Sequence, residues 1–77
     1  MIKSSDKKIL RKLGSHIKKL RKQTNLSLRE MSYACNVDNS KISKIEKGAI
    51  NITFTTIVQL AAALEIKPNG LLDFVFE

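Results

Sequence analysis

The stretch LSLREMSYACNVDNSKISKIEKG, residues 26–48, predicts two short helices joined by a tight turn. Its apolar residues recur mostly at helical spacing, and this periodicity breaks around residues 36–38. Asn36 suits the turn, because asparagine tolerates the left-handed backbone conformation that a sharp reversal between helices needs. The second helix begins with polar side chains that contribute nothing to a core, and their presence has to be explained by function.

Local signals mark where both helices begin and end. Ser27 and Glu30 have the spacing of a capping box, which predicts a helix over residues 28–35. Asp38 is the expected cap of a helix over residues 39–47, and Gly48 is expected to end it. The inward-facing residues of this pair would be Met31, Cys35, Val37, Ile42 and Ile45.

A longer amphipathic helix is predicted over residues 7–23, with Asp6 or Ser5 as its cap. One face carries Leu10, Leu13, Ile17 and Leu20, and the other carries most of the basic residues. Gly14 lies inside this helix at a cost of about 1 kcal/mol relative to alanine, which suggests close packing at that point. The pair Thr24-Asn25 is expected to end the helix.

Two further helices are predicted in the C-terminal third. Thr53 would cap a helix that reaches residue 64, with Phe54, Ile57, Leu60, Ala61 and Leu64 as its buried stripe. Pro68, which is favoured in the first turn of a helix, would begin a short helix over residues 68–73. The expected fold class is therefore all-α, a compact bundle of five helices.

Composition limits the kind of protein. A chain of 77 residues makes one domain with a marginal core, and its net charge of +7 favours a polyanionic partner over a merely solvated basic face. One cysteine and one histidine complete neither a disulfide nor a zinc site, so we expect no metal and no cofactor. The sequence shows no signal peptide and no membrane span, and we expect a cytoplasmic protein.

The sequence contains no catalytic constellation. It has no Ser-His-Asp set and no glycine-rich phosphate loop, so we predict that the protein is not an enzyme. His16 and Tyr33 are expected at the surface, and Cys35 in the core.

Two helices joined by a three-residue turn form a helix-turn-helix when the second helix is exposed and polar at its start. The major groove of DNA, about 12 Å wide, accepts such a helix and offers it donors and acceptors on the base edges. The predicted base-reading residues are Asn39, Ser40, Lys41, Ser43 and Lys44. The alternative is that these residues form an ordinary solvated helix face.

Residues 17–72 resemble the Cro/C1-type (XRE-like) helix-turn-helix family of phage repressors and small bacterial regulators. The matching segments, in the family's order, are IKKLRKQTNLS, VDNSKISKIEKG, NITFTTIVQLAAALEI and PNGLLD. The resemblance divides the chain into a basic N-terminal part (residues 1–16), the helix-turn-helix domain (17–72, with the motif at about 28–47) and an apolar tail (73–77).

The resemblance also implies roles for individual residues. Arg21 and Glu46 match a buried ion pair between the first and third helices. The implied phosphate contacts are Ser27, Arg29, Lys47, Asn51 and Thr53. Leu28 stands where the family commonly has glutamine, so Arg29 is expected to take over that contact.

The apolar C-terminus suggests a subunit interface, because exposed apolar patches usually mark interfaces. Its residues are Leu71, Leu72, Phe74, Val75 and Phe76, and the alternative is that they pack on the protomer's own core.

The predicted function is a sequence-specific regulator of transcription, of the controller or simple repressor type. It would bind an inverted-repeat operator in double-stranded DNA as a homodimer. The alternative is an antitoxin or protein-interaction module whose main partner is a protein.

Overall fold

The computed structural model describes residues 4–73, and its side chains from residue 6 onward. This part of the chain consists of helices α1 (Ser4–Gln23), α2 (Leu28–Cys35), α3 (Asn39–Glu46), α4 (Phe54–Ala63) and α5 (Pro68–Leu71), without any strand. The predicted all-α class with five helices is therefore confirmed. No helix among the described residues is long and apolar enough to span a bilayer.

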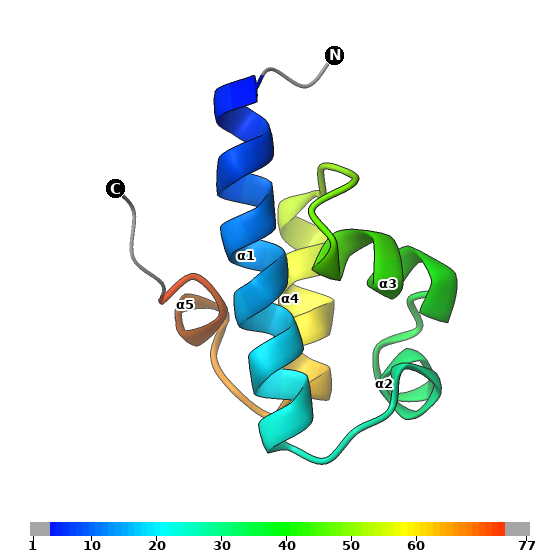
Figure 1. Ribbon diagram of the computed structural model, residues 1–77. Helices are drawn as coiled ribbons and strands as arrows, with labels where there is room; N and C mark the ends of the chain where they lie inside the picture. Colours follow the sequence, from blue (N-terminus) through cyan, green and yellow to red (C-terminus); the bar gives the residue numbers. More distant parts are fainter. Residues whose placement is uncertain (1–3, 74–77) are drawn as a thin grey trace.

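Helix α1 is the longest element and lies along one side of the bundle (Figure 1). Its 20 residues span about 30 Å, close to the longest dimension of the structure, 31 Å. It packs against α3 and α5, while α2 packs against α3 and α4. In Figure 1, α3 begins far from α1 and ends against it.

The core collects one or more residues from every helix. The large side chains without accessible surface are Ile17, Met31, Ile42, Leu60 and Leu71. All five residues predicted to face inward from the helix pair are buried, and Cys35 is one of them. Because α2 and α3 are only eight residues each, their stability comes from this shared packing rather than from helix propensity.

The predicted buried stripe of α4 is wrong at its first residue. Phe54 is 65% exposed, and Val58, four residues later, is 39% exposed on the same side of the helix. Leu60, Ala61 and Leu64 are buried as predicted, whereas Ile57 is only half-buried and packs against the core. Phe54 fits the apolar periodicity but lies at the edge of the stripe, where none of the other helices covers it.

Most predicted helix ends are confirmed. The capping box of Ser27 and Glu30 is present, Asp38 and Thr53 cap α3 and α4, and Gly48 follows α3 with a φ of 71°. Asn25 and Asn36 both adopt the left-handed conformation, with φ of 61° and 58°. Glu65 does so as well at the end of α4, with a φ of 58°, where no signal in the sequence indicated it.

The start of α1 corrects another prediction. The helix begins at Ser4, so Asp6 lies in its first turn rather than capping it. A carboxylate in the first turn still favours the helix, because it lies near the positive end of the helix dipole. At the other ends, α3 stops at Glu46 with Lys47 as its C-cap, and α5 stops at Leu71.

Candidate nucleic-acid interface

Helix α3 separates its apolar anchors from its polar surface. Ile42 and Ile45 are 0% and 2% exposed, and they hold the helix on the core. The five predicted base-reading residues lie on the rest of the helix: Asn39, Ser40, Lys41 and Lys44 are exposed, and Ser43 is half-buried. The first turn of α3 is therefore a polar tip that is free to meet a ligand.

Asp38 organises this tip. Its Oδ2 accepts hydrogen bonds from the backbone N–H of Ser40, at 3.1 Å, and from the Ser40 hydroxyl. The hydrogen bond from the Ser40 hydroxyl, helped by the one from its backbone, lowers the pKa of Asp38, so the carboxylate is charged at neutral pH. Because the Ser40 hydroxyl donates to Asp38, its lone pairs are left to accept from a ligand donor such as the amino group of adenine or cytosine. The residue pattern predicts the cap but not this hydroxyl contact.

The other end of α3 is pressed against α1. A Cβ added to Gly14 would lie 2.3 Å from the carbonyl oxygen of Ile45, and one added to Gly48 would lie 2.7 Å from Cα of Arg11. Only glycine allows these two backbones to approach so closely. The close packing expected at Gly14 is thus confirmed, and its partner is the last turn of α3.

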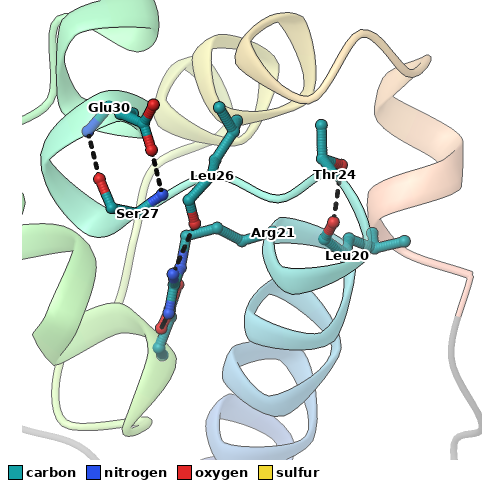
Figure 2. A network of polar contacts seen from close by, with 7 residues as sticks. Leu20, Arg21, Thr24, Leu26, Ser27 and Glu30 are labelled. Carbon is teal, nitrogen blue, oxygen red and sulfur yellow. Dashed lines mark hydrogen bonds and ion pairs between the residues drawn. The ribbon is translucent and has the colours of Figure 1, made fainter.

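The predicted ion pair between Arg21 and Glu46 is present at the same junction. Nε of Arg21 donates to Oε2 of Glu46 at 2.7 Å, and Nη2 donates to Oε1 at 3.1 Å. Nη1 donates to the carbonyl of Leu26 at 2.8 Å, so one guanidinium joins α1, the α1–α2 turn and α3 (Figure 2). The hydrogen bond with Glu46 raises the pKa of Arg21 despite the opposing effect of burial. The paired hydrogen bonds between Arg21 and Glu46 hold the last turn of α3 against α1.

Two of the predicted phosphate contacts lie at the start of α2. Ser27 accepts from the backbone N–H of Glu30 at 3.0 Å, and the Glu30 carboxylate accepts from the backbone N–H of Ser27 at 2.9 Å (Figure 2). Nε of Arg29 donates to the Tyr33 hydroxyl at 2.9 Å. This contact does not use the two terminal nitrogens of the guanidinium, which can donate to another acceptor. Tyr33 is 71% exposed, as expected, but this contact was missed; the four-residue spacing was its only signal.

The remaining predicted phosphate contacts lie in the segment after α3. Lys47, Asn51 and Thr53 are all exposed. The side-chain oxygen of Asn51 accepts from the backbone N–H of Ile52 at 2.9 Å, so its amide N–H groups are left for a ligand. Thr53 accepts from the backbone N–H of Thr56 at 3.2 Å, and the first N–H groups of α4 have no partner within the helix. This segment can therefore offer several donors to a phosphate.

The structure changes the predicted dimer surface. Leu71 has no accessible surface, because α5 packs against α4 and α1, so Leu71 is a core residue of the protomer and not an interface residue. Leu72 is 37% exposed, whereas Phe74, Val75 and Phe76 lie outside the described residues. Phe54 and Val58 supply further exposed apolar surface that the sequence analysis had assigned to the core or passed over.

His16 is more enclosed than expected. It is half-buried, and its Nε2 lies 3.0 Å from the carbonyl oxygen of Gly70, so it links α1 to α5. Within residues 4–73, no three His, Cys, Asp or Glu side chains gather as a metal site would require.

Comparisons with known proteins agree with this geometry. The helix-turn-helix family HTH_3 matches residues 17–71. The control protein C.BamHI of Bacillus amyloliquefaciens is 31% identical over 62 residues, which cover 79% of this chain and 76% of that protein. The restriction-modification controller protein C.AhdI of Aeromonas hydrophila superposes with a TM-score of 0.81 at 31% identity, over 83% of this chain and 97% of that one.

A third similar structure is an HTH_3 family transcriptional regulator from Vibrio cholerae, with a TM-score of 0.82 at 25% identity. The match covers 87% of this chain and 38% of the longer Vibrio chain. The family match, the sequence relative and the shared five-helix fold together identify this chain as a member of the HTH_3 helix-turn-helix family, whose members are DNA-binding regulators of transcription and not enzymes.

Proposed function

We propose that this regulator binds an inverted-repeat operator in double-stranded DNA as a homodimer, with the tip of α3 in the major groove. The observation that carries the proposal is the division of α3 into an exposed polar first turn and a last turn locked against α1 by Gly14 and the Arg21–Glu46 pair. A helix held at one end keeps its tip in a constant orientation, and base readout requires this.

In this proposal the contacts fall into two classes. Asn39, Ser40, Lys41, Ser43 and Lys44 read base edges, because amide, hydroxyl and ammonium groups match the donors and acceptors of the major groove. Ser27, Arg29, Lys47, Asn51 and Thr53 bind phosphates and set the register of the protein on the duplex. Tyr33 supports this second class by orienting Arg29.

The homodimer is proposed from exposed apolar surface. Phe54 and Val58 share one face of α4, and Leu72 follows α5, which packs against α4. The tail residues Phe74, Val75 and Phe76 remain proposed dimer contacts. A two-fold dimer would place its two α3 helices about 34 Å apart, one turn of DNA, so that each reads one half-site.

The two controller proteins among the relatives point to a biological role. We propose that this chain controls the expression of restriction-modification genes from the cytoplasm, at an operator in their promoter region. In this proposal the concentration of the regulator sets the occupancy of the operator.

Selection of bound duplexes from a random pool tests the readout. The selected sequences should share an inverted repeat, and Lys41→Ala should relax the preference at one base pair per half-site, at a cost of about 1–3 kcal/mol. Lys67→Ala, an exposed lysine just before α5, is the matched control and should leave the selected sequence unchanged. A uniform loss across all sequences would assign Lys41 to the phosphates instead.

The dimer is tested by sedimentation without DNA. Phe54→Ser/Val58→Ser should shift the chain towards monomer, and a chain that ends at residue 73 tests the tail while keeping Leu71 in the core. If both variants sediment as the parent dimer does, the interface lies elsewhere.

A protein partner is the second candidate function, because the 65% exposure of Phe54 would suit a partner protein as well as a second copy. Co-purification of a stoichiometric foreign protein from the native host would favour this candidate.

A further inference from the structure

The outward side of α1 carries a second concentration of positive charge, separate from α3. Seven of its residues are exposed cations on one arc of the helix, which we call the outer cationic face: Lys7, Lys8, Arg11, Lys12, Lys18, Lys19 and Lys22. At 3.6 residues per turn they span an arc of about 140°, in which Ser15 is the only uncharged position between residues 7 and 22. The one acidic residue of α1, Asp6, lies outside the arc. Half of the chain's 14 lysines and arginines are thus gathered on a single surface.

Arg11, at the edge of the face, packs against Gly48, but no described acidic side chain pairs with any of the seven cations, and all seven are exposed. Within the described side chains the only ion pair is that of Arg21 with Glu46, on the buried side of α1. Leu10, Leu13 and Ile17 face the core, and Gly14 faces α3. The first turns of α1 also rise above the other helices in the view of Figure 1, so the face extends past the rest of the bundle.

The face is directed differently from the reading tip. Helix α3 meets α1 through its last turn, at Gly14, and its first turn lies at the far end of α3 from that contact. The first turn of α3 and the outer cationic face are therefore separated by the length of α3. Lys8, Lys12 and Lys19 lie on the part of the arc farthest from α3.

We propose that the outer cationic face binds the phosphate backbone of a second segment of duplex DNA while α3 holds the operator. This inference rests on the proposed function, since it presupposes that α3 holds the first duplex. From residue 7 to residue 22 the face is about 23 Å long, the axial length of about seven phosphates of one strand. Six of its seven cations are lysines, whose point charges suit sequence-independent contacts.

Two other partners fit this face less well. A protein interface usually has an apolar or aromatic centre, and the arc contains neither kind of residue. A helix that lies on a membrane needs large apolar side chains along its length, whereas Ile9, the exposed apolar residue of α1, lies outside the arc.

The test is the capture of a free duplex by an immobilised complex. The full chain is bound at saturation to the inverted-repeat duplex obtained from the selection, and a fluorescent 40-base-pair duplex of random sequence is added. Lys8→Gln/Lys12→Gln/Lys19→Gln should reduce capture by about tenfold or more at physiological salt, with operator affinity changed by no more than about threefold. Lys8→Arg/Lys12→Arg/Lys19→Arg should retain capture, because charge is conserved.

A matched triple variant on α3 separates this inference from the proposed function. Lys41→Gln/Lys44→Gln/Lys47→Gln should lose preference for the operator yet still bind the random duplex through α1. If that variant keeps its preference, the proposed function fails, whatever α1 does.

Three outcomes would overturn the inference itself. Capture that is unchanged in the α1 glutamine triple would make the face a solvated surface. A parallel loss of capture and operator affinity would place these lysines on the same DNA as α3. Displacement of the random duplex by polyglutamate at equal charge concentration would mean that DNA is not the preferred occupant.

Discussion

The two ends of α3 have opposite surroundings, one buried against α1 and the other exposed. At its last turn, Glu46 is buried and bonded twice to Arg21, and the Ile45 carbonyl lies so close to Gly14 that no Cβ fits between them. At its first turn, Asn39, Ser40 and Lys41 are exposed, and the contacts are those of a local cap. One helix of eight residues thus contains both a rigid junction and an open surface.

This difference shows how a short domain can vary what it reads without changing its fold. The junction depends on interactions that a substitution readily weakens, because they combine a buried ion pair with close backbone contact. The tip depends on almost nothing inside the protomer, so its side chains can be chosen for the ligand alone. Substitutions at the junction should therefore reduce stability, and substitutions at the tip should reduce binding.

The largest effect is expected from Glu46→Ala. Removal of the carboxylate leaves Arg21 buried without its partner, which costs about 3–5 kcal/mol. A domain of this size has about 4–12 kcal/mol of stability in total, so the loss is a large fraction of the free energy of unfolding and should lower the midpoint of denaturation. Urea denaturation followed by circular dichroism measures the change.

A double variant shows whether the stranded charge causes the loss. Arg21→Met/Glu46→Leu should recover part of the stability lost in Glu46→Ala, because no buried charge remains. Recovery should be incomplete, since Arg21 also bonds the carbonyl of Leu26. A double variant as unstable as the single one would contradict this explanation.

The next largest effect is expected from Gly14→Ala. Alanine improves helix propensity by about 1 kcal/mol, but its methyl group would meet the carbonyls of Ile45 and Glu46 at 2.3 and 2.5 Å. These are backbone atoms and cannot rotate away, so we expect a net loss of about 1–3 kcal/mol from overpacking and a displaced α3. Denaturation and operator affinity should both be impaired.

Gly70 offers a matched control for this experiment. A Cβ at Gly70 would have its nearest contact 3.6 Å away, at a side-chain atom of Ile66, which is ordinary van der Waals distance. Gly70→Ala should therefore be neutral or stabilise by up to about 1 kcal/mol. If both variants lost stability equally, close packing at the junction would not be the cause.

Some features of the junction and of the tip could be predicted from local sequence, and others could not. Capping residues, the left-handed Asn36 and the glycine after α3 act through their immediate neighbours, so local spacing predicted them. The Arg21–Glu46 pair joins residues 25 positions apart, and only the family resemblance supplied it. Phe54, Leu71 and His16 were misplaced because burial depends on what distant segments cover. The apolar periodicity does not predict that the packing of α5 against α4 and α1 buries Leu71, or that Phe54 on α4 stays exposed.

A smaller effect on stability is expected at the tip itself. Asn39→Ala and Lys41→Ala remove exposed side chains without buried partners, so the free energy of unfolding should change by no more than about 0.5 kcal/mol. Binding to the selected operator should nevertheless weaken by about 1–3 kcal/mol for each base that is no longer read. Denaturation and fluorescence anisotropy on the same preparations separate the two quantities. A large loss of stability at either residue would remove the contrast between the two ends of α3.

The smallest effect concerns the charge of the cap at Asp38. Its hydrogen bonds with Ser40 lower the pKa of Asp38 in the folded state, so the ionised cap stabilises the fold above the ordinary pKa of a carboxyl group, near pH 4. That contribution should be lost as the pH falls through the lowered pKa of the folded state.

Asp38→Asn keeps an amide oxygen to cap α3 but removes the charge. Thermal unfolding should show the variant slightly less stable than the parent at pH 7, with the difference shrinking to nothing as both are acidified below that pKa. Because the two proteins differ only at residue 38, effects of acid elsewhere in the fold are common to both and largely cancel from the comparison. A difference that persisted unchanged at the lowest pH would mean that the shape of the cap matters and its charge does not.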